Sequence, residues 1–268
     1  MTTPPTILVF DSGLGGLTVL REIVAMRPDA DVVYVADDAF FPYGGHPEEK
    51  VVARVVPLVG ELIARHRPDI VVIACNTIST VALPQLRAAH SVPFVGTVPG
   101  IKPACAMSQT RRVSVLGTKG TVAREYTQKL IADFSDGCEV TLVGSGRLAP
   151  LAEAAMRGEA VDDDAIAAEI AGCFMDGVAR TDTVVLACTH FPLLTQRMAR
   201  LAPWPVHWLD PAPAIARRVA DLVGAPGGSS PRAPPRMIFS SGAEASPDLV
   251  RAIDPFFGGR LAGACNPL

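Results

Sequence analysis

Runs of basic residues, paired cysteines and long apolar stretches are all missing from this 268-residue chain. The basic residues are scattered and the net charge at pH 7 is −3, so the composition favours neither nucleic acid nor an acidic membrane surface as a partner. No apolar stretch approaches the roughly 18 to 20 residues that span a bilayer, and no positively charged segment precedes the first apolar strand, as it would in a signal peptide. We therefore expect a cytoplasmic protein without a membrane anchor.

The six cysteines follow no disulfide or zinc spacing, since no Cys-x-x-Cys pair occurs and only one histidine, His190, lies within three residues of a cysteine. No metal site is expected. The four lysines lie in no setting that favours a pyridoxal phosphate Schiff base, so no cofactor is expected either. Single cysteines in a reducing compartment are core residues, nucleophiles or bases. Four of them have ordinary structural settings and are expected to be inert, namely Cys105, Cys138, Cys173 and Cys265.

One short phrase occurs twice in the sequence. An acidic residue, a β-branched apolar run and an Ala-Cys pair make up residues 69–77, and the same order recurs in residues 182–190. The offset between the two acids equals the offset between the two cysteines, Cys75 and Cys188. Each apolar run is typical of a buried strand in a parallel sheet, and polar residues begin where the strand ends. Two thiols are therefore expected at the carboxyl ends of equivalent strands, where open α/β sheets hold their ligands.

Apolar segments of strand length alternate with helical segments along the chain, and this alternation predicts an α/β fold. The expected strands cover residues 7–10, 32–35, 70–74, 94–98, 113–116, 140–143, 184–187, 206–209 and 237–240. The clearest expected helices cover residues 17–26, 48–65, 122–132 and 166–178. The Gly-, Ser- and Pro-rich stretch 224–235 is expected to be a surface loop.

A second similarity supports two related halves. Residues 10–15 and 116–121 are both strand-to-helix turns that end in small residues. Each half would then carry one Gly-rich turn and one Cys turn, and two such halves would face one another across a cleft. We expect two similar parallel-sheet α/β domains with the functional site in that cleft.

Two loops at strand ends contain candidate binding residues. In residues 11–16 the glycines expose amide groups at a helix N-terminus, which suits a carboxylate or phosphate. An ordinary turn in which Asp11 or Ser12 caps the helix is the equal alternative. Residues 36–45 gather aromatic residues, proline and glycine into one loop, which favours a rigid wall with free backbone groups over an ordinary surface loop.

The two Cys turns are the strongest candidates. A thiol at the start of a helix lies near the positive end of the helix dipole, which is expected to favour its thiolate. The thiols are followed by hydrogen-bond donors, namely Asn76, Thr77, Thr189 and His190. Residues two apart on a turn rarely aim at each other, so His190 is expected to support Cys188 or to act as a general acid. The pattern alone indicates that Glu153 is a solvated helix residue.

Four of these motifs together resemble the motif set of the glutamate racemases, which belong to the cofactor-independent Asp/Glu racemase group. The motifs run in the family's order and at its spacing over nearly the full chain, at residues 10–16, 36–44, 74–77 and 186–193. The resemblance implies two α/β domains with the active site between them. One would comprise residues 1–98 plus 210–268, and the other residues 99–209.

The resemblance also implies roles for residues by their position. Cys75 and Cys188 match the two catalytic bases. The residues that would assist them are Asp11, Glu153 and His190. The residues that would bind the substrate are Asp11, Ser12, Tyr43, Gly44, Asn76, Thr77, Thr118, Thr121, Thr189 and His190.

The reaction implied by the resemblance interconverts L- and D-glutamate and supplies D-glutamate for peptidoglycan. One thiolate removes the proton from Cα and a thiol returns a proton on the opposite face, so one sulfur must be ionised while the other stays protonated. Glutamate is the implied small-molecule partner, and the resemblance is compatible with a homodimer.

Three other interpretations stay open at this point. The first is an aspartate or hydantoin racemase of the same group. The second is a non-catalytic two-domain protein that closes on an acidic metabolite, which would leave the paired cysteines unexplained. The third is a Cys–His hydrolase, which would require acylation of Cys188.

Overall fold

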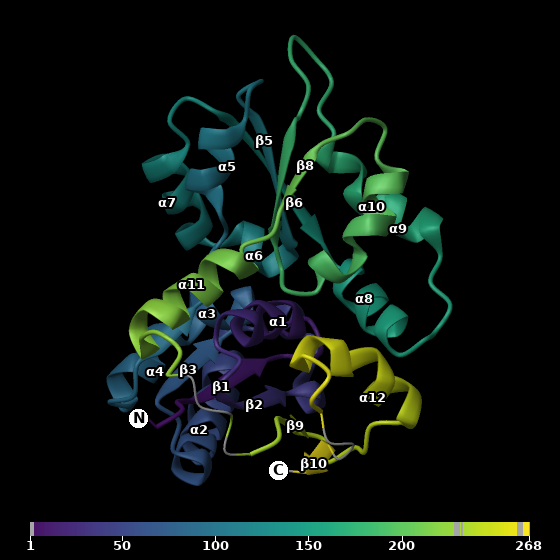
Figure 1. The fold of residues 1–268 in the computed structure, drawn as a ribbon. Helices are drawn as coiled ribbons and strands as arrows, with labels where there is room; N and C mark the ends of the chain where they lie inside the picture. The colour runs from purple at the N-terminus through teal and green to yellow at the C-terminus, as the bar shows by residue number, and fades with distance from the viewer. Residues whose placement is uncertain (1–2, 228–230, 232, 262–264, 268) are drawn as a thin grey trace.

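The computed structural model describes residues 3–227, 231, 233–261 and 265–267, and its described strands form two parallel sheets, one below the other in Figure 1. Sheet A has the strand order β10-β9-β2-β1-β3-β4, built from β1 (Thr6–Asp11), β2 (Asp31–Ala36), β3 (Ile70–Ile73), β4 (Phe94–Gly96), β9 (Arg236–Phe239) and β10 (Cys265–Pro267). Sheet B has the order β6-β5-β7-β8, built from β5 (Arg112–Thr118), β6 (Glu139–Ser145), β7 (Thr183–Ala187) and β8 (His207–Leu209). The expected α/β fold is confirmed.

The two sheets repeat one strand order. The run β2-β1-β3-β4 of sheet A corresponds to β6-β5-β7-β8 of sheet B, and every neighbouring pair is parallel. In this correspondence β3 and β7 are equivalent strands. Cys75 follows the first and Cys188 follows the second. The prediction that the repeated phrase marks equivalent strands is therefore confirmed.

The acidic residue that opens each copy of the phrase ties its strand to the central strand beside it. Asp69 accepts a hydrogen bond of 2.7 Å from the N–H of Thr6, the first residue of β1. Asp182 accepts the N–H groups of Gln109 at 2.7 Å and Thr110 at 2.9 Å, just before β5. Because β1 and β5 are also equivalent, both acids have the same structural role, at the sheet edge opposite the cysteines.

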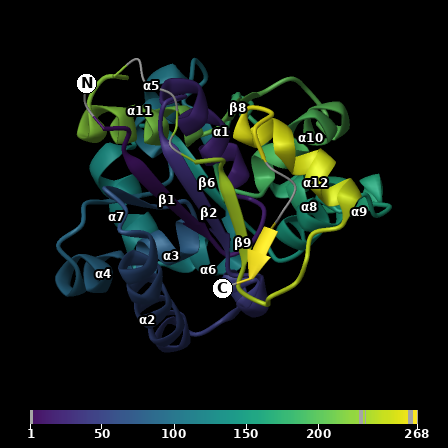
Figure 2. The same cartoon turned by 60° about the horizontal axis from the view of Figure 1, so that its bottom comes forward.

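Helices cover both sheets (Figures 1 and 2). We call sheet A and its helices the sheet-A unit; they are α1 (Leu17–Met26), α2 (Glu48–His66), α3 (Asn76–Val81), α4 (Leu83–Ala89), α11 (Ala212–Val223) and α12 (Pro247–Ile253). The sheet-B unit contains α5 (Ile101–Met107), α6 (Lys119–Ala123), α7 (Glu125–Phe134), α8 (Leu148–Met156), α9 (Asp163–Ile170) and α10 (Thr195–Leu201). Short 3-10 turns lie at η1 (Asp38–Phe40), η2 (Tyr43–Gly45), η3 (Ala171–Cys173), η4 (Phe191–Leu194) and η5 (Asp254–Phe257).

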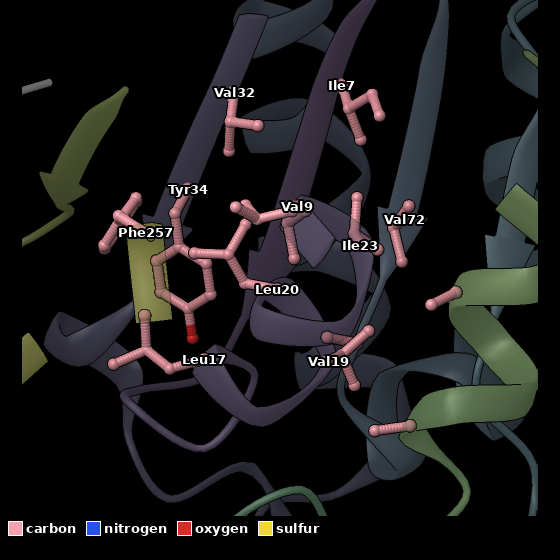
Figure 3. Packing of buried hydrophobic residues seen from close by; sticks show 14 of the residues in the cluster. Ile7, Val9, Leu17, Val19, Leu20, Ile23, Val32, Tyr34, Val72 and Phe257 are labelled. Carbon is pink, nitrogen blue, oxygen red and sulfur yellow. The ribbon is translucent and has the colours of Figure 1, made fainter. Parts of the chain in front are cut away.

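The central strand β1 is buried along its whole length because helices pack on both faces of sheet A. Ile7 and Val9 point to the face covered by α1 and α11, whereas Leu8 and Phe10 point to the face covered by α2. Figure 3 shows the first of these cores, where Tyr34 of β2 lies beside the side chains of α1. Because both faces are covered, the centre of the strand, residues 7–10, reads as an uninterrupted apolar run.

The expected strands are all found, with small shifts at their ends. One strand was not expected: β10 contains Cys265, whose side chain lies outside the described residues. Cys105, Cys138 and Cys173 are buried, as expected for core residues. Of the expected loop 224–235, the described residues form neither helix nor strand, and residues 228–230 and 232 lie outside the described part.

Two helix predictions are partly wrong. The predicted helix 122–132 is interrupted at Arg124, whose extended backbone (φ −75°, ψ 142°) separates α6 from α7. The predicted helix 166–178 ends early, since α9 stops at Ile170 and a 3-10 turn follows. Val178, which fitted the apolar helical spacing, is fully exposed in a loop. Apolar spacing alone does not show where a helix ends, because an apolar residue beyond the last turn can fit the same spacing.

The chain passes between the two units twice, once between β4 and α5 and once between β8 and α11. The expected domain limits at residues 98/99 and 209/210 fall in these two segments, and their exact positions stay predictions. Within the described part of the chain, no helix combines the length and apolarity needed to cross a membrane.

Asp182→Asn is expected to destabilise the protein at neutral pH but not in acid. Although burial raises the pKa of Asp182, hydrogen bonds led by the one from Thr110 lower it overall. A carboxyl of this kind stabilises the fold above its unfolded pKa, and that stability is lost as the pH falls through the folded pKa. Loss of about 1 to 2 kcal/mol of hydrogen bonding corresponds to a thermal midpoint roughly 2 to 8 °C lower at pH 7.

Calorimetry of the Asp182→Asn variant between about pH 3 and pH 7 measures this difference, which should shrink below about pH 4. The exposed Asp133 of α7 provides the matched control, Asp133→Asn. A midpoint equal to wild type at pH 7, or a difference that grows in acid, would contradict the assigned role.

Candidate active site

One small cavity lies between the two units, at the carboxyl ends of their strands. Its volume is about 20 Å³, roughly the space of one water molecule. The cavity is lined by Ser12, Phe41, Pro42, Tyr43, Gly44, Cys75, Asn76, Thr77, Thr118, Ala149, Cys188, Thr189 and His190. Apart from Ala149 of α8, these residues lie at the carboxyl ends of strands or in the turns and first helical residues that follow them, which is where open α/β folds bind ligands.

The two thiols face this cavity from different units. Cys75 is the N-cap residue of α3 and is 6% exposed, and Cys188 directly follows β7 and is 7% exposed. Burial raises the pKa of Cys75 well above its usual value, and the nearby charge of Asp11 raises it further. The expectation that the helix dipole favours the Cys75 thiolate is therefore wrong, because desolvation outweighs the dipole of a short helix. Cys75 is protonated at neutral pH.

Asp11 ends β1, is fully buried and joins the two units behind the cavity. It accepts hydrogen bonds from the N–H of Ser12 at 2.5 Å and from its hydroxyl at 3.0 Å. Its other oxygen accepts the hydroxyl of Thr189, in the sheet-B unit, at 2.8 Å. Burial raises the pKa of Asp11 despite these bonds. Because α1 begins after Gly16 without any side-chain cap, the alternative in which Asp11 or Ser12 caps the helix is wrong.

His190 is buried between Cys188 and Glu153. Its Nδ1 lies 3.9 Å from the Cys188 sulfur and its Nε2 lies 2.8 Å from Glu153 Oε1. Although burial lowers the pKa of His190, these two contacts raise it well above its usual value, so the ring is positively charged at neutral pH. The Gly15 N–H also lies 3.2 Å from Nε2, but a protonated nitrogen is a donor, so Nε2 donates to Glu153. The expectation that Cys188 and His190 do not aim at each other is wrong.

Glu153 on α8 is 8% exposed, so the pattern-based prediction of a solvated residue is wrong. Burial raises the pKa of Glu153, but the hydrogen bond and charge of His190 lower it overall, which keeps the carboxylate ionised. The same Oε1 that contacts His190 accepts the N–H of Leu14, in the sheet-A unit, at 2.5 Å. Glu153 therefore orients His190 and joins the two units at once.

Glycines in the turn between β1 and α1 allow this close approach of the sheet-B unit. A Cβ on Gly13 would lie 2.2 Å from Glu153 Oε1, and a Cβ on Gly15 would lie 2.3 Å from His190 Nδ1. Neither separation is compatible with ordinary van der Waals contact. The hydroxyl of Tyr34 donates to the Gly13 carbonyl at 2.6 Å and fixes the turn from the side of β2. Only glycine fits at these two positions while the contact is formed.

Hydroxyl groups from both units meet at another part of the cavity. The hydroxyl oxygens of Thr77 and Thr118 lie 3.5 Å apart, one from each unit. Thr118 is the N-cap residue of α6 and accepts the N–H of Thr121 at 3.1 Å, while their hydroxyls are 2.9 Å apart. Thr121 therefore holds Thr118 in place and does not itself line the cavity.

Asn76 presents an unpaired amide group to the cavity. The residue is 2% exposed, and neither its side-chain oxygen nor its side-chain nitrogen has a hydrogen-bond partner in the described structure. Buried polar atoms are nearly always paired, because an unpaired one costs about 1 to 3 kcal/mol. Both atoms of this amide are available to a ligand.

A buried carboxylate outside the cavity holds the loop that carries Tyr43. Asp37 is fully buried and accepts the hydroxyl of Tyr43, the hydroxyl of Ser240 and two bonds from Arg54, at 3.0 and 2.6 Å. Although burial raises the pKa of Asp37, these bonds lower it overall. Tyr43 thus directs its proton to Asp37 and contributes its ring to the cavity wall. Gly44 follows, and a Cβ there would lie 2.9 Å from that of Thr118.

The structure brings the predicted site residues together, although their roles stay predictions. Three of them lie just behind the cavity, each bonded to a residue that lines it: Asp11, Thr121 and Glu153. Sequence reasoning did not single out three lining residues: Phe41, Pro42 and Ala149. The first two lie in the aromatic loop that the sequence favoured as a wall, and the Phe41 ring lies 5.3 Å from that of His190. Ala149 carries no chemical signal.

Two further features bear on the chemistry of the site. The Asp37 network was missed because Arg54 and Ser240 are distant from the motifs in sequence and have ordinary side chains. Among the residues that the structure describes, no group of three or more His, Cys, Asp or Glu side chains is placed to hold a metal ion.

Known proteins resemble this chain over most of its length. The family model described as Asp/Glu/Hydantoin racemase matches residues 7–219. A glutamate racemase of Brucella ovis is 58% identical over 221 residues, which cover 82% of this chain and 80% of that protein. A glutamate racemase of Brucella anthropi is also 58% identical, over 81% of this chain and 79% of that protein.

Solved structures agree with the sequence matches. Escherichia coli glutamate racemase, crystallised with L-glutamate and the activator UDP-MurNAc-ala, is 38% identical with a TM-score of 0.86, covering 99% of this chain and 98% of that one. Glutamate racemase from Aquifex pyrophilus is 29% identical with a TM-score of 0.72, covering 94% and 95%. The family match includes every turn that lines the cavity. The chain therefore belongs to the Asp/Glu/Hydantoin racemase family.

Proposed function

We propose that this protein interconverts L- and D-glutamate without a cofactor, with Cys75 and Cys188 as the two bases. The observation that carries the proposal is that two thiols follow equivalent strands of two units and face one cavity. Racemisation needs a base on one face of Cα and an acid on the other, and this arrangement supplies a thiol from each side. The names of the relatives favour glutamate as the substrate.

The two thiols differ in their electrostatic surroundings. Burial and the charge of Asp11 keep Cys75 protonated. Beside Cys188 lies the ring of His190, whose pKa is raised by its contacts with Cys188 and Glu153. We assign removal of the Cα proton of one enantiomer to Cys188, while Cys75 supplies a proton to the opposite face. The reverse reaction needs the opposite protonation of the pair, which proton exchange with the substrate itself produces.

Proton removal from Cα develops negative charge that spreads onto the adjacent carboxylate of glutamate. Preorganised donors around the cavity lower the energy of that state. The donors we assign to the substrate carboxylates are Ser12, Asn76, Thr77, Thr118 and Thr189. Asn76 carries the most weight among them, because both atoms of its buried amide lack a partner in the described structure.

The cavity as it stands is too small for an amino acid with two carboxylates. Glutamate therefore enters only when the two units move apart. Opening must break the contacts of the β1–α1 turn with the sheet-B unit, which include the Thr189–Asp11 and Leu14–Glu153 hydrogen bonds. Closure around the substrate then excludes water from the reacting thiols.

We assign the product, D-glutamate, to peptidoglycan synthesis, and the enzyme to the cytoplasm, where free glutamate and the early precursors of peptidoglycan are found. A homodimer is compatible with this assignment.

A direct assay tests the proposal. Purified protein is incubated with L- or D-glutamate in the presence of a chelator and without pyridoxal phosphate, and the enantiomers are separated by chiral chromatography. We expect each enantiomer to reach an equal mixture, with kcat/KM for glutamate at least about tenfold above that for aspartate. Faster racemisation of aspartate or a hydantoin would identify that compound as the substrate, while the protein would remain a racemase of the same family. Tight binding without turnover would identify a binding protein instead.

Gly15→Ala is expected to lower kcat/KM for glutamate about 100-fold or more, because the added Cβ forces His190 away from Cys188. The matched control is Gly45→Ala, where a Cβ meets no atom within 4 Å and activity should stay within about twofold of wild type. Thermal unfolding establishes that both variants are folded. A folded Gly15→Ala variant with wild-type kcat/KM would contradict the role of the His190 contact.

A further inference from the structure

An ion pair crosses the cleft outside the cavity. Glu48, in the first turn of α2, belongs to the sheet-A unit, and Arg124 lies at the break between α6 and α7 in the sheet-B unit. Arg124 Nε donates to Glu48 Oε1 at 3.0 Å. The Arg124 side chain is 11% exposed, whereas that of Glu48 is 62% exposed. The cation is thus largely buried near the cleft, and its partner is a solvent-exposed carboxylate.

The pair lies one layer of residues away from the cavity. Gly44 and Thr118 line the cavity, and Gly120 follows in the first turn of α6. A Cβ on Gly120 would lie 3.1 Å from the Gly44 carbonyl oxygen and 3.4 Å from Arg124 Nη1. The guanidinium therefore lies beside the first turn of α6. Thr118, the N-cap residue of the same helix, lines the cavity.

A groove of about 520 Å³ opens to solvent at this point, lined by Glu48, Thr80, Gly120, Ala123, Arg124, Glu125 and Tyr126. Residues of both units form it, and Thr80 lies one helical turn after the cavity residue Thr77 on α3. The groove is wide enough for an amino acid, unlike the closed cavity beside it. The contact between Gly44 and Gly120 lies between the groove and the cavity.

Arg124 has capacity for a second acceptor. Its Nη1 is buried and has no hydrogen-bond partner in the described structure. A guanidinium presents its donors as a planar fork that matches a carboxylate with two bonds, and Glu48 uses only one of them. The bond to an exposed carboxylate is weak, because water competes for the same oxygen atoms, and it is exchanged easily.

We propose that Glu48 and Arg124 form the outer gate of the cleft, and that Arg124 exchanges Glu48 for a carboxylate of the entering amino acid as the two units part. The inference rests on the proposed racemisation of glutamate. Because a carboxylate of the amino acid replaces the carboxylate of Glu48, the positive charge of Arg124 stays neutralised while the amino acid enters. Arg54, which lies behind the cavity wall, is held by Asp37 and is not available for this step.

Steady-state kinetics in both directions test the gate with Arg124→Gln, Arg124→Lys and Glu48→Gln. Arg124→Gln removes the recognising cation, so KM for both enantiomers should rise about tenfold while kcat changes less than about threefold. Glu48→Gln releases the cation, so KM should fall about two- to threefold. Arg124→Lys keeps the charge without the planar fork and should give an intermediate KM.

The salt dependence gives a second readout. Between about 20 and 300 mM NaCl, screening should lower kcat/KM of wild type more steeply than that of Arg124→Gln. The control is Arg251→Gln, which removes an equally charged but exposed arginine on α12 and should match wild type in KM and salt dependence. If Arg124→Gln folds poorly, the test compares KM of Arg124→Lys, which should rise, with KM of Glu48→Gln, which should fall.

The outcomes separate this inference from the proposed function. A pair that only ties the units together is broken by either substitution, so equal changes of KM in Arg124→Gln and Glu48→Gln would overturn the gate. So would a KM for Arg124→Gln within about twofold of wild type. Both results require an active wild-type enzyme. Wild type without racemase activity would instead refute the proposed function.

Discussion

The close contact between the β1–α1 turn and the sheet-B unit is the constraint on which the site depends. Gly13 and Gly15 let Glu153 and His190 approach the backbone of the other unit to hydrogen-bond distance. That approach buries Glu153 and His190 together. Their charge-assisted hydrogen bond offsets the free-energy cost of removing both groups from water. It also places the charged ring beside Cys188.

A repeated topology carries different chemistry in its two halves. Equivalent strands deliver Cys75 and Cys188, and equivalent acids at their opposite ends have only a structural role. The surroundings of the thiols are not equivalent. Cys75 lies near the buried carboxyl of Asp11, and Cys188 contacts the imidazolium of His190. A near-symmetric fold thus places its two sulfurs in different electrostatic surroundings, as the proposed proton transfer across Cα requires.

Sequence predicted the strands and the residues at their ends because buried parallel strands and Gly-rich turns have strong local signals. It did not predict what depends on the approach of distant segments. Glu153 looks solvated until α8 meets the Leu14 amide, and the pKa of Cys75 depends on water excluded by both units. The break between α6 and α7 occurs at Arg124, and neither glycine nor proline stands at that position to indicate it in the sequence. These properties arise from tertiary contacts, which neither periodicity nor local propensity records.

The central claim is that Cys75 and Cys188 stand on opposite faces of one Cα. Exchange of the α-proton with deuterated solvent, followed by NMR for Cys75→Ser and Cys188→Ser with each enantiomer of glutamate, tests it most directly. Each variant should lose racemisation by several orders of magnitude, yet each should still exchange the proton of one enantiomer, and not the same one. Exchange of the same enantiomer by both variants, or full racemase activity in either, would contradict the account.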